Sequence, residues 1–274
     1  MSSAYLNTSP KTKVMAAQGT AWQIQKRVIG ALMIRELTTR FGRENIGFLW
    51  MMAEPLLFAT LVSVMWRFVR GPDEHGVSIF AFVVTGYVPL TLFRHVLTRS
   101  ISIFVANGSL LYHRQIKLVD FILVRFLIEL IGAMMAGIFV GGVMYAVGVF
   151  PMPYSFGWLI GGWMLYALFC FSMALVIAPL SELSEVLEKI VPVTTYIMIP
   201  VSGTFNMVQW LTPQAREYIV WSPLVSGVEM IRYGVFGDAV TPYYNIPVAL
   251  GSSLLMAVVG LSLCRRVRRT LVVE

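Results

Sequence analysis

The sequence has little charge, and over long stretches it has none. Asp, Glu, Lys and Arg make up 13% of its 274 residues, whereas 57% are hydrophobic, and the mean hydropathy is +0.74. No charged side chain occurs in residues 130–181, 190–215 or 239–264. A water-soluble domain needs more charge than this to cover its surface, and about 20 apolar residues suffice for a helix to cross a bilayer. The composition therefore excludes a soluble fold and predicts an all-α membrane protein.

The sequence also lacks the motifs of nucleotide, metal and nucleophilic chemistry. The dipeptide Gly-Lys, with which a P-loop ends, never occurs, and neither does His-Glu-x-x-His, Cys-x-x-Cys or Gly-x-Ser-x-Gly. We expect no metal site, because the three histidines fall in different segments: His75, His95 and His113. Cys170 and Cys264 lie in apolar runs without metal-binding spacing, and we interpret them as structural. Any energised work must therefore draw on a different subunit.

The chain does not open on a short apolar core with a small-residue cleavage site, so we expect no signal peptide and a cytoplasmic N-terminus. Residues 18–38 instead carry an apolar stripe along one side of a helix, made of Trp22, Val28, Ile29, Leu32, Met33 and Leu37. This pattern predicts a helix that lies in the inner-leaflet interface. A helix that packs on a partner protein gives a similar pattern.

Six apolar stretches predict membrane spans, at residues 46–68, 79–100, 121–149, 156–178, 190–210 and 246–264. An even number of spans keeps both termini on one side. With the N-terminus inside, 17 of the 21 Lys and Arg residues lie on or near the cytoplasmic side, as the positive-inside rule requires. The net charge of +7 follows these membrane boundaries rather than one groove, which argues against nucleic acid as a partner.

This topology divides the chain into three parts. Residues 1–45 form a cytoplasmic tail and the interfacial helix, residues 46–264 the transmembrane domain, and residues 265–274 a basic cytoplasmic tail. The outer segment 211–238 is too charged to span and too apolar for an ordinary loop, and Pro223 divides it into two helical pieces. Irregular backbone is tolerated at membrane depth only inside protein or a water-filled cavity, so we predict a re-entrant helical hairpin there.

Some charged residues fall within or beside the predicted spans, namely Glu54, Arg94, Arg125 and Glu129. Because charge is costly in lipid, we expect these side chains to face the bundle interior, a cavity or the interface. For Arg94, Arg99 and Arg125, snorkelling toward the headgroups is the simpler interpretation. Glu54 lies about one-third of the way into its span, where we favour an ion pair with Arg43 or Arg94 over a proton relay.

Aromatic residues gather near the predicted outer face: Trp210, Tyr218, Trp221, Tyr233, Tyr243 and Tyr244. The ordinary interpretation is an aromatic belt at the membrane surface. Stacking on sugar rings along an exit path is the alternative.

The whole pattern resembles the type-2 ABC exporter permeases, with a basic interfacial helix, six spans, a short cytoplasmic helix and an outer hairpin. Three segments are closely similar to the inner-membrane permease of group 2 capsular polysaccharide export: FGRENIGFLW…EPLL, NGSLLYHRQIKLVDFILVR and PVSGTFNMVQWLTPQAREYIVWSPLVSGVEMIRYGVFG. The resemblance covers nearly the whole chain, although O-antigen permeases share the general layout. It implies ATP-driven movement of a lipid-linked capsular polysaccharide from cytoplasm to periplasm.

The resemblance also implies partners. It predicts a homodimer in the bacterial inner membrane, in contact with membrane lipids, with the path between its two copies. Two copies of a separate ATPase subunit would bind Mg-ATP, so this chain itself would carry no cofactor. Periplasmic and outer-membrane export proteins would take the glycan onward.

Roles for individual residues follow from the same resemblance. The first span would leave the interfacial helix through Gly47, Leu49, Trp50 and Pro55. A coupling helix over residues 109–117 would contact the ATPase through Leu110, Leu111, Tyr112, Arg114 and Gln115. The translocation path would include Trp50, Glu54, Arg67, Arg70, Arg94 and Arg99. The entering cargo and the lipid headgroups would meet Arg40 and Arg43.

Two alternatives remain from the sequence. One is a permease of the same architecture with another cargo, such as O-antigen, a teichoic-type polymer or a lipophilic drug. The other is a non-transporting scaffold or a self-energised carrier, and co-purification of an ATPase would exclude it. A proton-coupled carrier is disfavoured, because the acidic residues avoid the span centres and no internal repeat is evident.

Overall fold

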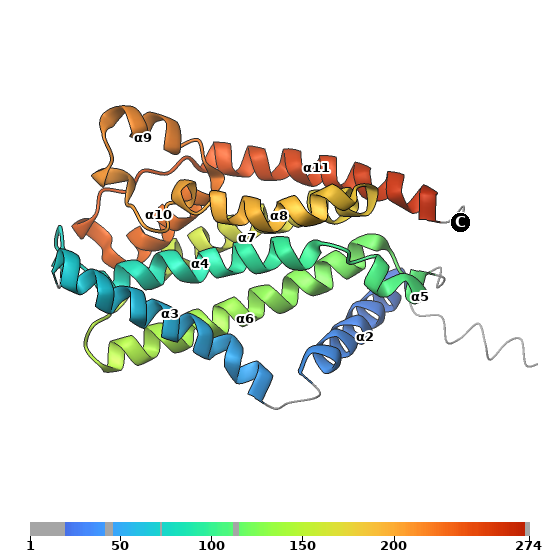
Figure 1. Cartoon of the computed structure of the whole chain (residues 1–274), viewed down its shortest axis with the longest axis horizontal. Coiled ribbons are helices and arrows are strands. Elements are labelled where there is room, and N and C mark those ends of the chain that lie inside the picture. Colours follow the sequence, from blue (N-terminus) through green and yellow to red (C-terminus); the bar gives the residue numbers. More distant parts are fainter. Residues whose placement is uncertain (1–19, 42–45, 72, 112–114, 272–274) are drawn as a thin grey trace, which may run out of the picture.

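The computed structural model describes residues 20–41, 46–71, 73–111 and 115–271 as a bundle of helices along one long axis (Figure 1). The helices are α2 (Ala21–Phe41), α3 (Ile46–Arg70), α4 (Ile79–Ser100), α5 (Gly108–Leu111), α6 (Leu118–Ala146), α7 (Phe156–Leu183), α8 (Glu185–Ile197), α9 (Pro213–Ile219), α10 (Pro223–Phe236) and α11 (Ile246–Leu271). Short 3-10 helices are η1 (Val105–Asn107), η2 (Pro200–Ser202), η3 (Val208–Trp210) and η4 (Gly237–Ala239).

The two ends of the bundle differ. At one end lie α5 and the C-terminal part of α11, and we call it the α5 end (Figure 1). At the other lie α9 and a small antiparallel pair, β1 (Asp73–Glu74) and β2 (Val77–Ser78), and we call it the hairpin end. His75 and Gly76 join these strands with φ angles of 54° and 81°. Two successive positive φ angles are typical of a tight hairpin turn.

Five described helices are long and apolar enough to cross a membrane: α3, α4, α6, α7 and α11. They coincide with five of the six predicted spans. The remaining prediction, residues 190–210, differs from the structure: α8 begins at Glu185, ends at Ile197 and has 13 residues. Beyond it, Pro200 opens η2 and Gly203 takes a left-handed φ of 74°, so the α-helix does not continue.

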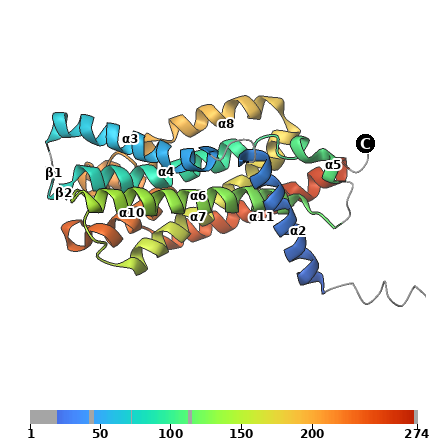
Figure 2. The same cartoon turned by 90° about the horizontal axis from the view of Figure 1, so that it is seen from below.

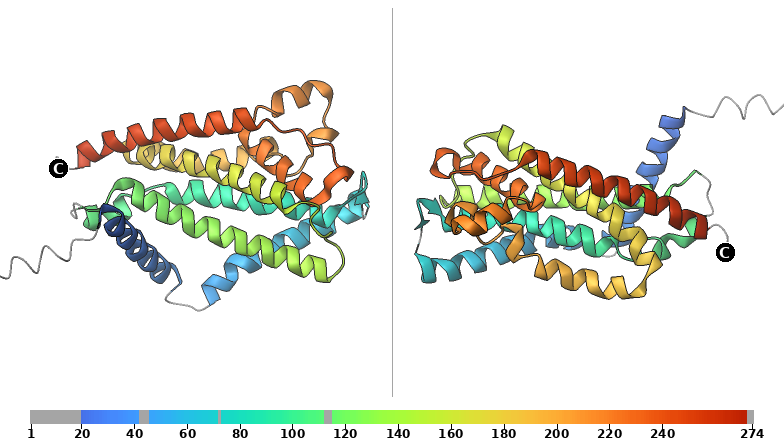
Figure 3. Two further views of the ribbon diagram at one scale, coloured as in Figure 1. Left: turned by 180° about the vertical axis from the view of Figure 1, so that it is seen from behind. Right: turned by 90° about the horizontal axis from the view of Figure 1, so that it is seen from above.

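α4 forms the centre of the bundle. In its apolar window 83% of residues are buried, against 17% in the corresponding windows of α3 and α11. α4 packs against α3, α6, α7, α8 and α10, whereas α11 runs along the outside, beside α7 (Figure 3). The apolar faces of α3 and α11 are therefore left for lipid or for another protein chain.

The predicted division of segment 211–238 at Pro223 is confirmed by α9 and α10. The two pieces have different environments: no residue of α9 is buried, whereas α10 is packed against α7, α11 and α4. Glycines allow this close packing. A Cβ at Gly234 of α10 would lie 2.4 Å from the backbone nitrogen of Leu159 on α7, so only hydrogen fits there.

Candidate functional site

α2 packs across the α5 end of the bundle, at an oblique angle to the other helices (Figure 2). The middle of its predicted apolar stripe contacts protein: Leu32 is buried, and Val28, Ile29 and Met33 pack against the same core. Trp22, at the start of the stripe, is 65% exposed. The centre of the stripe therefore packs on the bundle, whereas Trp22 at its N-terminal end is exposed.

Charged residues of α2, α4 and α6 meet at this end, and we call them the charge cluster: Glu36, Arg40, His95, Arg99, Arg125 and Glu129. Glu129 of α6 is its centre and is only 3% exposed. Its carboxylate accepts a hydrogen bond from Arg40 of α2 and lies 3.2 Å from Nε of Arg99 and 3.5 Å from Nδ1 of His95, both on α4. A buried carboxylate is stable only with such partners, so Glu129 joins three helices.

The second carboxylate of the charge cluster lies on α2. Glu36 Oε1 is 2.9 Å from Nη2 of Arg40 and 3.3 Å from Nε of Arg125 on α6. Arg125 also donates a hydrogen bond of 2.6 Å to the backbone carbonyl of Arg99. Arg99 and Arg125, for which snorkelling toward the headgroups was the simpler interpretation, thus contact carboxylates of the protein, and Arg125 also binds a backbone carbonyl.

Two further polar links tie α2 to the connection between α4 and α6. Gln25 Nε2 donates to Asp120 Oδ1 at 2.5 Å, near the start of α6. Arg35 Nη1 donates to Asn107 Oδ1 at 2.9 Å, immediately before α5. Neither pair has a local sequence signal, since the partners are 95 and 72 residues apart. α2 is thereby fixed to residues on either side of segment 109–117, to which the resemblance assigns coupling.

The same connection is also bound from its other side. The backbone N–H of Ser102 donates to Ser181 Oγ of α7 at 3.3 Å, and its hydroxyl donates to Glu188 of α8. The Ser102 φ of 51° places it in the left-handed region, which a non-glycine residue adopts at a cost. The connection after α4 thus contacts α2, α7 and α8.

The predicted coupling helix is shorter in the structure than the range 109–117. α5 comprises Gly108–Leu111, and residues 115–117 are not helical. Leu110 and Leu111 are half-buried against the core, and Gln115 is exposed. Two predicted contacts, Tyr112 and Arg114, lie outside the described residues.

The residues predicted to line the path, and those predicted to meet the entering cargo and the headgroups, occupy several places. Arg40 and Arg99 meet at Glu129, and Glu54 and Arg67 are exposed on α3, with Arg67 toward the hairpin end. The side chains of Trp50 and Arg70 lie outside the described part of the chain, as does Arg43 altogether.

Arg94 lies on another face from the charge cluster. Its guanidinium is 4.4 Å from the ring centroid of Tyr196 on α8, so it joins α4 to α8. Two turns earlier on α4, Tyr87 stacks on Phe58 of α3, with ring centroids 4.0 Å apart. The predicted Glu54–Arg94 ion pair does not form between these described side chains.

These contacts define a face formed by α3, α4 and α8 (Figure 2), which we call the α3–α8 face. Large apolar side chains are exposed along it: Leu57, Phe58, Leu61, Val64, Met65 and Phe68 from α3, and Val186, Ile190, Val193, Tyr196 and Ile197 from α8. Glu54 of α3 and Glu185 of α8 are exposed carboxylates on these helices. The face combines apolar surface with a few charges.

A buried ion pair on α10 was not predicted from the sequence. Arg232 is 1% exposed and Glu229, one turn earlier, is 4% exposed. Arg232 donates to the backbone carbonyls of Gly203 and Thr204 at 2.6 Å each and of Asn206 at 3.1 Å. The available signal was the Glu-x-x-Arg spacing in an otherwise apolar segment, which puts both charges on one side of a helix.

This pair holds the irregular backbone that follows α8. Glu229 accepts hydrogen bonds from the backbone N–H groups of Val208 and Tyr243, at 3.3 and 3.4 Å. Carbonyls that a continuous helix would have satisfied internally are satisfied instead by the Arg232 guanidinium. α10 therefore stabilises the irregular segment 200–210 through hydrogen bonds from Arg232 and to Glu229.

The outer aromatic residues separate into packed and exposed groups. Trp210 packs on Phe82, with ring centroids 4.8 Å apart. The Arg216 guanidinium carbon lies 4.4 Å from the ring centroid of Tyr243. Tyr218 of α9 and Trp221, just after it, are 80% and 66% exposed, so these two are the more accessible to membrane or glycan.

Comparison with known proteins gives the following matches. The family model described as ABC-2 type transporter matches residues 27–236. The capsule polysaccharide export inner-membrane protein CtrC of Neisseria meningitidis serogroup B is 39% identical over 88% of this chain and 91% of its own. BexB of Haemophilus influenzae, with the same description, is 38% identical over 87% and 90%. The polysialic acid transport protein KpsM of Escherichia coli is 24% identical over 92% and 96%.

Proposed function

The chain belongs to the ABC-2 type transporter family, and we infer that it is the inner-membrane permease of a capsule polysaccharide export system. One observation carries this conclusion: two relatives named for that function are 39% and 38% identical to it over about nine-tenths of their own length. The same similarity favours a capsule polysaccharide over O-antigen, teichoic-type polymers and drugs. The chain is the membrane component of the exporter and not its ATPase.

We propose that a separate ABC ATPase subunit binds at the α5 end and hydrolyses Mg-ATP there. The absence of a Gly-Lys dipeptide from the sequence supports an external ATPase. Support for the place comes from Ser102, Asn107 and Asp120, which link this end to α7, α8 and α2. A displacement of α5 by the ATPase would therefore move several membrane helices together rather than one.

The path lies, in this proposal, between two copies of the chain that face each other through the α3–α8 face. The exposed carboxylate of Glu54 among large apolar side chains supports this arrangement. A helix surface that faced only lipid would need no charged residue. Glu54 and Arg94 would then border the path, near its α5 end. Residues 185–210, in which α8 gives way to irregular backbone, would form the sixth crossing beside it.

We further propose that the α5 end is cytoplasmic and that α2 lies at the membrane surface there. Of the described basic residues, Arg265, Arg266, Arg268 and Arg269 end α11 at this end, which supports the orientation. The segment α9–α10 would re-enter from the periplasmic side, with α10 inside protein. Periplasmic and outer-membrane export proteins would receive the glycan at the hairpin end.

The charge cluster fits a mechanical role in this scheme. Arg40 and Arg99 were predicted to meet cargo and headgroups, but both bind Glu129 in the described structure. We propose that they hold α2 to α4 and α6, so that α2 moves with the bundle during each transport stroke. Arg94, which packs on Tyr196, keeps its proposed place at the path.

The experiment that tests the function is deletion of the gene in its native host, followed by localisation of the polysaccharide. We expect a bare cell surface and a lipid-linked glycan that accumulates inside the cell. Expression of the chain from a plasmid should restore the capsule, which controls for effects on neighbouring genes. A normal capsule in the deletion strain would overturn the assignment of cargo.

A further inference from the structure

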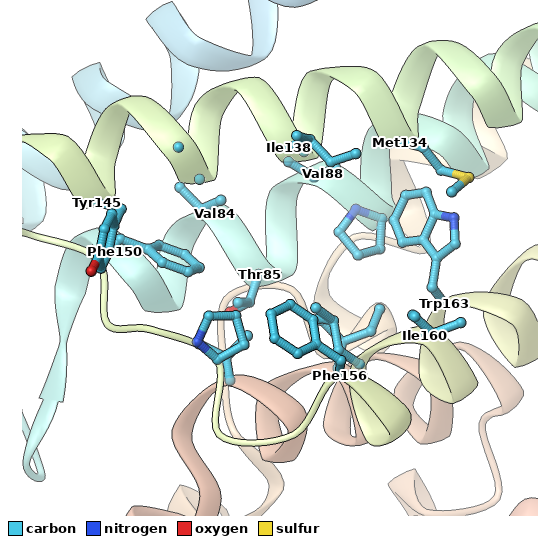
Figure 4. A pocket seen from close by; sticks show the side chains of 18 of the residues that line it. Val84, Thr85, Val88, Met134, Ile138, Tyr145, Phe150, Phe156, Ile160 and Trp163 are labelled. Carbon is cyan, nitrogen blue, oxygen red and sulfur yellow. The ribbon is translucent and has the colours of Figure 1, made fainter.

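Between α6 and α7, in the half of the bundle nearer the hairpin end, lies an apolar groove with a volume of about 550 Å³ (Figure 4). Met134, Ile138 and Tyr145 of α6 form one wall, and Phe156 and Ile160 of α7 form the other. More than half of the surface of Ile138, Tyr145, Phe156 and Ile160 is exposed, so the groove opens to the outside of the bundle, between two helices that are long and apolar enough to span a membrane. Its volume falls within the range of small-molecule sites, about 300–1,000 Å³.

The chain itself does not fill this groove. Its floor consists of Val84, Thr85 and Val88 of α4, all buried. The Thr85 hydroxyl donates to the Ala81 and Phe82 carbonyls, so its proton is already used within α4. On the α6 wall, a Cβ added at Gly141 or Gly142 would meet nothing within 4 Å. These glycines therefore leave open space instead of allowing a close helix contact.

A second pocket, of about 620 Å³, adjoins the groove at the hairpin end. The two share the wall residues Phe150, Pro151, Met152 and Val235. In contrast to the groove, the second pocket carries charge of both signs, from Arg67 at the end of α3 and Asp73 of β1. An apolar groove at membrane depth thus continues into a pocket with one cation and one anion at the membrane surface.

We propose that the groove and the pocket together bind one zwitterionic phospholipid of the adjoining leaflet. An acyl chain lies in the groove between α6 and α7, the headgroup phosphate lies against Arg67, and the headgroup ammonium lies against Asp73. The charge pattern distinguishes this occupant from an anionic lipid, whose headgroup would place its net negative charge beside Asp73. Exposed aromatic side chains at the rim, Tyr145, Tyr154 and Phe156, suit the level of the headgroups.

The test uses photo-crosslinking in membranes. The full chain, in complex with its ATPase, is reconstituted into vesicles that contain phosphatidylethanolamine with a diazirine midway along one acyl chain, and the labelled peptides are identified by mass spectrometry. A parallel sample contains phosphatidylglycerol with the same chain. We expect labelling concentrated on α6 and α7, severalfold stronger with phosphatidylethanolamine. Equal labelling of every lipid-facing helix, or a stronger signal from phosphatidylglycerol, would overturn the proposal.

Two variants and one control localise the effect. At Gly142 an added Cβ meets nothing within 4 Å, so Gly142→Leu places its side chain in the groove and should reduce labelling of α6 and α7 severalfold. Gly251→Leu on α11, where an added Cβ also meets nothing, is the control and should leave labelling unchanged. Asp73→Asn should remove the preference between headgroups while labelling of the groove persists. An unchanged Gly142→Leu result, displacement of the label by purified capsule glycolipid, or crosslinks that show a second copy in the groove would each refute a resident phospholipid.

Discussion

Nη1 of Arg232 lies 3.7 Å from Oε1 of Glu229, and the same arginine donates hydrogen bonds to three backbone carbonyls of the segment that follows α8. Neither side chain is more than 5% exposed. The pair therefore has two functions at once. It neutralises a charge buried inside α10, and it replaces the internal hydrogen bonds that the backbone loses where helix α8 ends.

Arg232→Lys should destabilise the protein. A lysine ammonium cannot reproduce the planar fork that serves the Gly203, Thr204 and Asn206 carbonyls, so at least one buried acceptor loses its partner, at a cost of about 1–3 kcal/mol. The measurement is thermal unfolding of the purified permease complex. Arg27→Lys makes the same change at an exposed position of α2 and should leave the unfolding temperature unaltered. Equal unfolding temperatures for the two variants would contradict the supporting role of α10.

Gly86→Ala tests the contact between α4 and the same segment. A Cβ at Gly86 would lie 2.3 Å from the Thr204 carbonyl oxygen and 2.9 Å from Nη2 of Arg232, so the segment must shift. Overpacking of this kind costs about 1–3 kcal/mol, and we expect a lower unfolding temperature and a lower yield. Gly30→Ala on α2 is the control, because its Cβ would meet nothing within 4 Å and alanine favours a helix by about 1 kcal/mol.

Glu129→Gln removes the central charge of the charge cluster. It leaves Arg40 and Arg99 near a neutral amide, and breaking a buried ion network in this way costs roughly 3–5 kcal/mol. We expect α2 to loosen, which hydrogen exchange of residues 20–41 would detect as faster exchange. Glu217→Gln on α9 is an exposed control. If α2 exchanges equally slowly in both variants, its apolar contacts alone hold it and the charge cluster does not.

Glu54→Gln and Glu54→Ala test the path. If Glu54 borders the route of the glycan, both changes should lower the amount of capsule at the cell surface severalfold without loss of the assembled complex, because the site is exposed and no buried partner is disturbed. Surface capsule is measured with a specific antibody, beside the level of the permease and its ATPase. Normal export by both variants would reduce Glu54 to a packing residue of α3.

Gln115→Asp tests docking of the ATPase. Gln115 is exposed after α5, so the change carries no cost to the core and acts only on a partner that contacts it. We expect less ATPase to co-purify with the permease and less capsule to be exported. Gln214→Asp makes the same change on α9 at the opposite end and should bind the ATPase normally. Should both variants bind it equally well, the proposed docking site at the α5 end would be wrong.

Helix positions were largely predictable, whereas the partners of charged residues were not. The α3, α4, α6, α7 and α11 helices follow from apolar length alone, because a chain in lipid must satisfy its backbone hydrogen bonds within each segment. The prediction for residues 190–210 was less accurate, since Pro200 and Gly203 end the regular helix although the segment stays apolar. The coupling helix was predicted over residues 109–117 from the family layout, whereas residues 115–117 are not helical in the structure.

The sequence by itself determined the class of the protein, five of its membrane helices and its family, because these depend on composition and on local pattern. The tertiary structure alone decided which partners the buried charges take across the chain. Arg40 meets Glu129 across 89 residues, and Arg232 meets the Gly203 carbonyl across 29. The physical reason is that a buried charge takes the nearest partner in space, and that partner is set by how the helices pack rather than by distance along the chain.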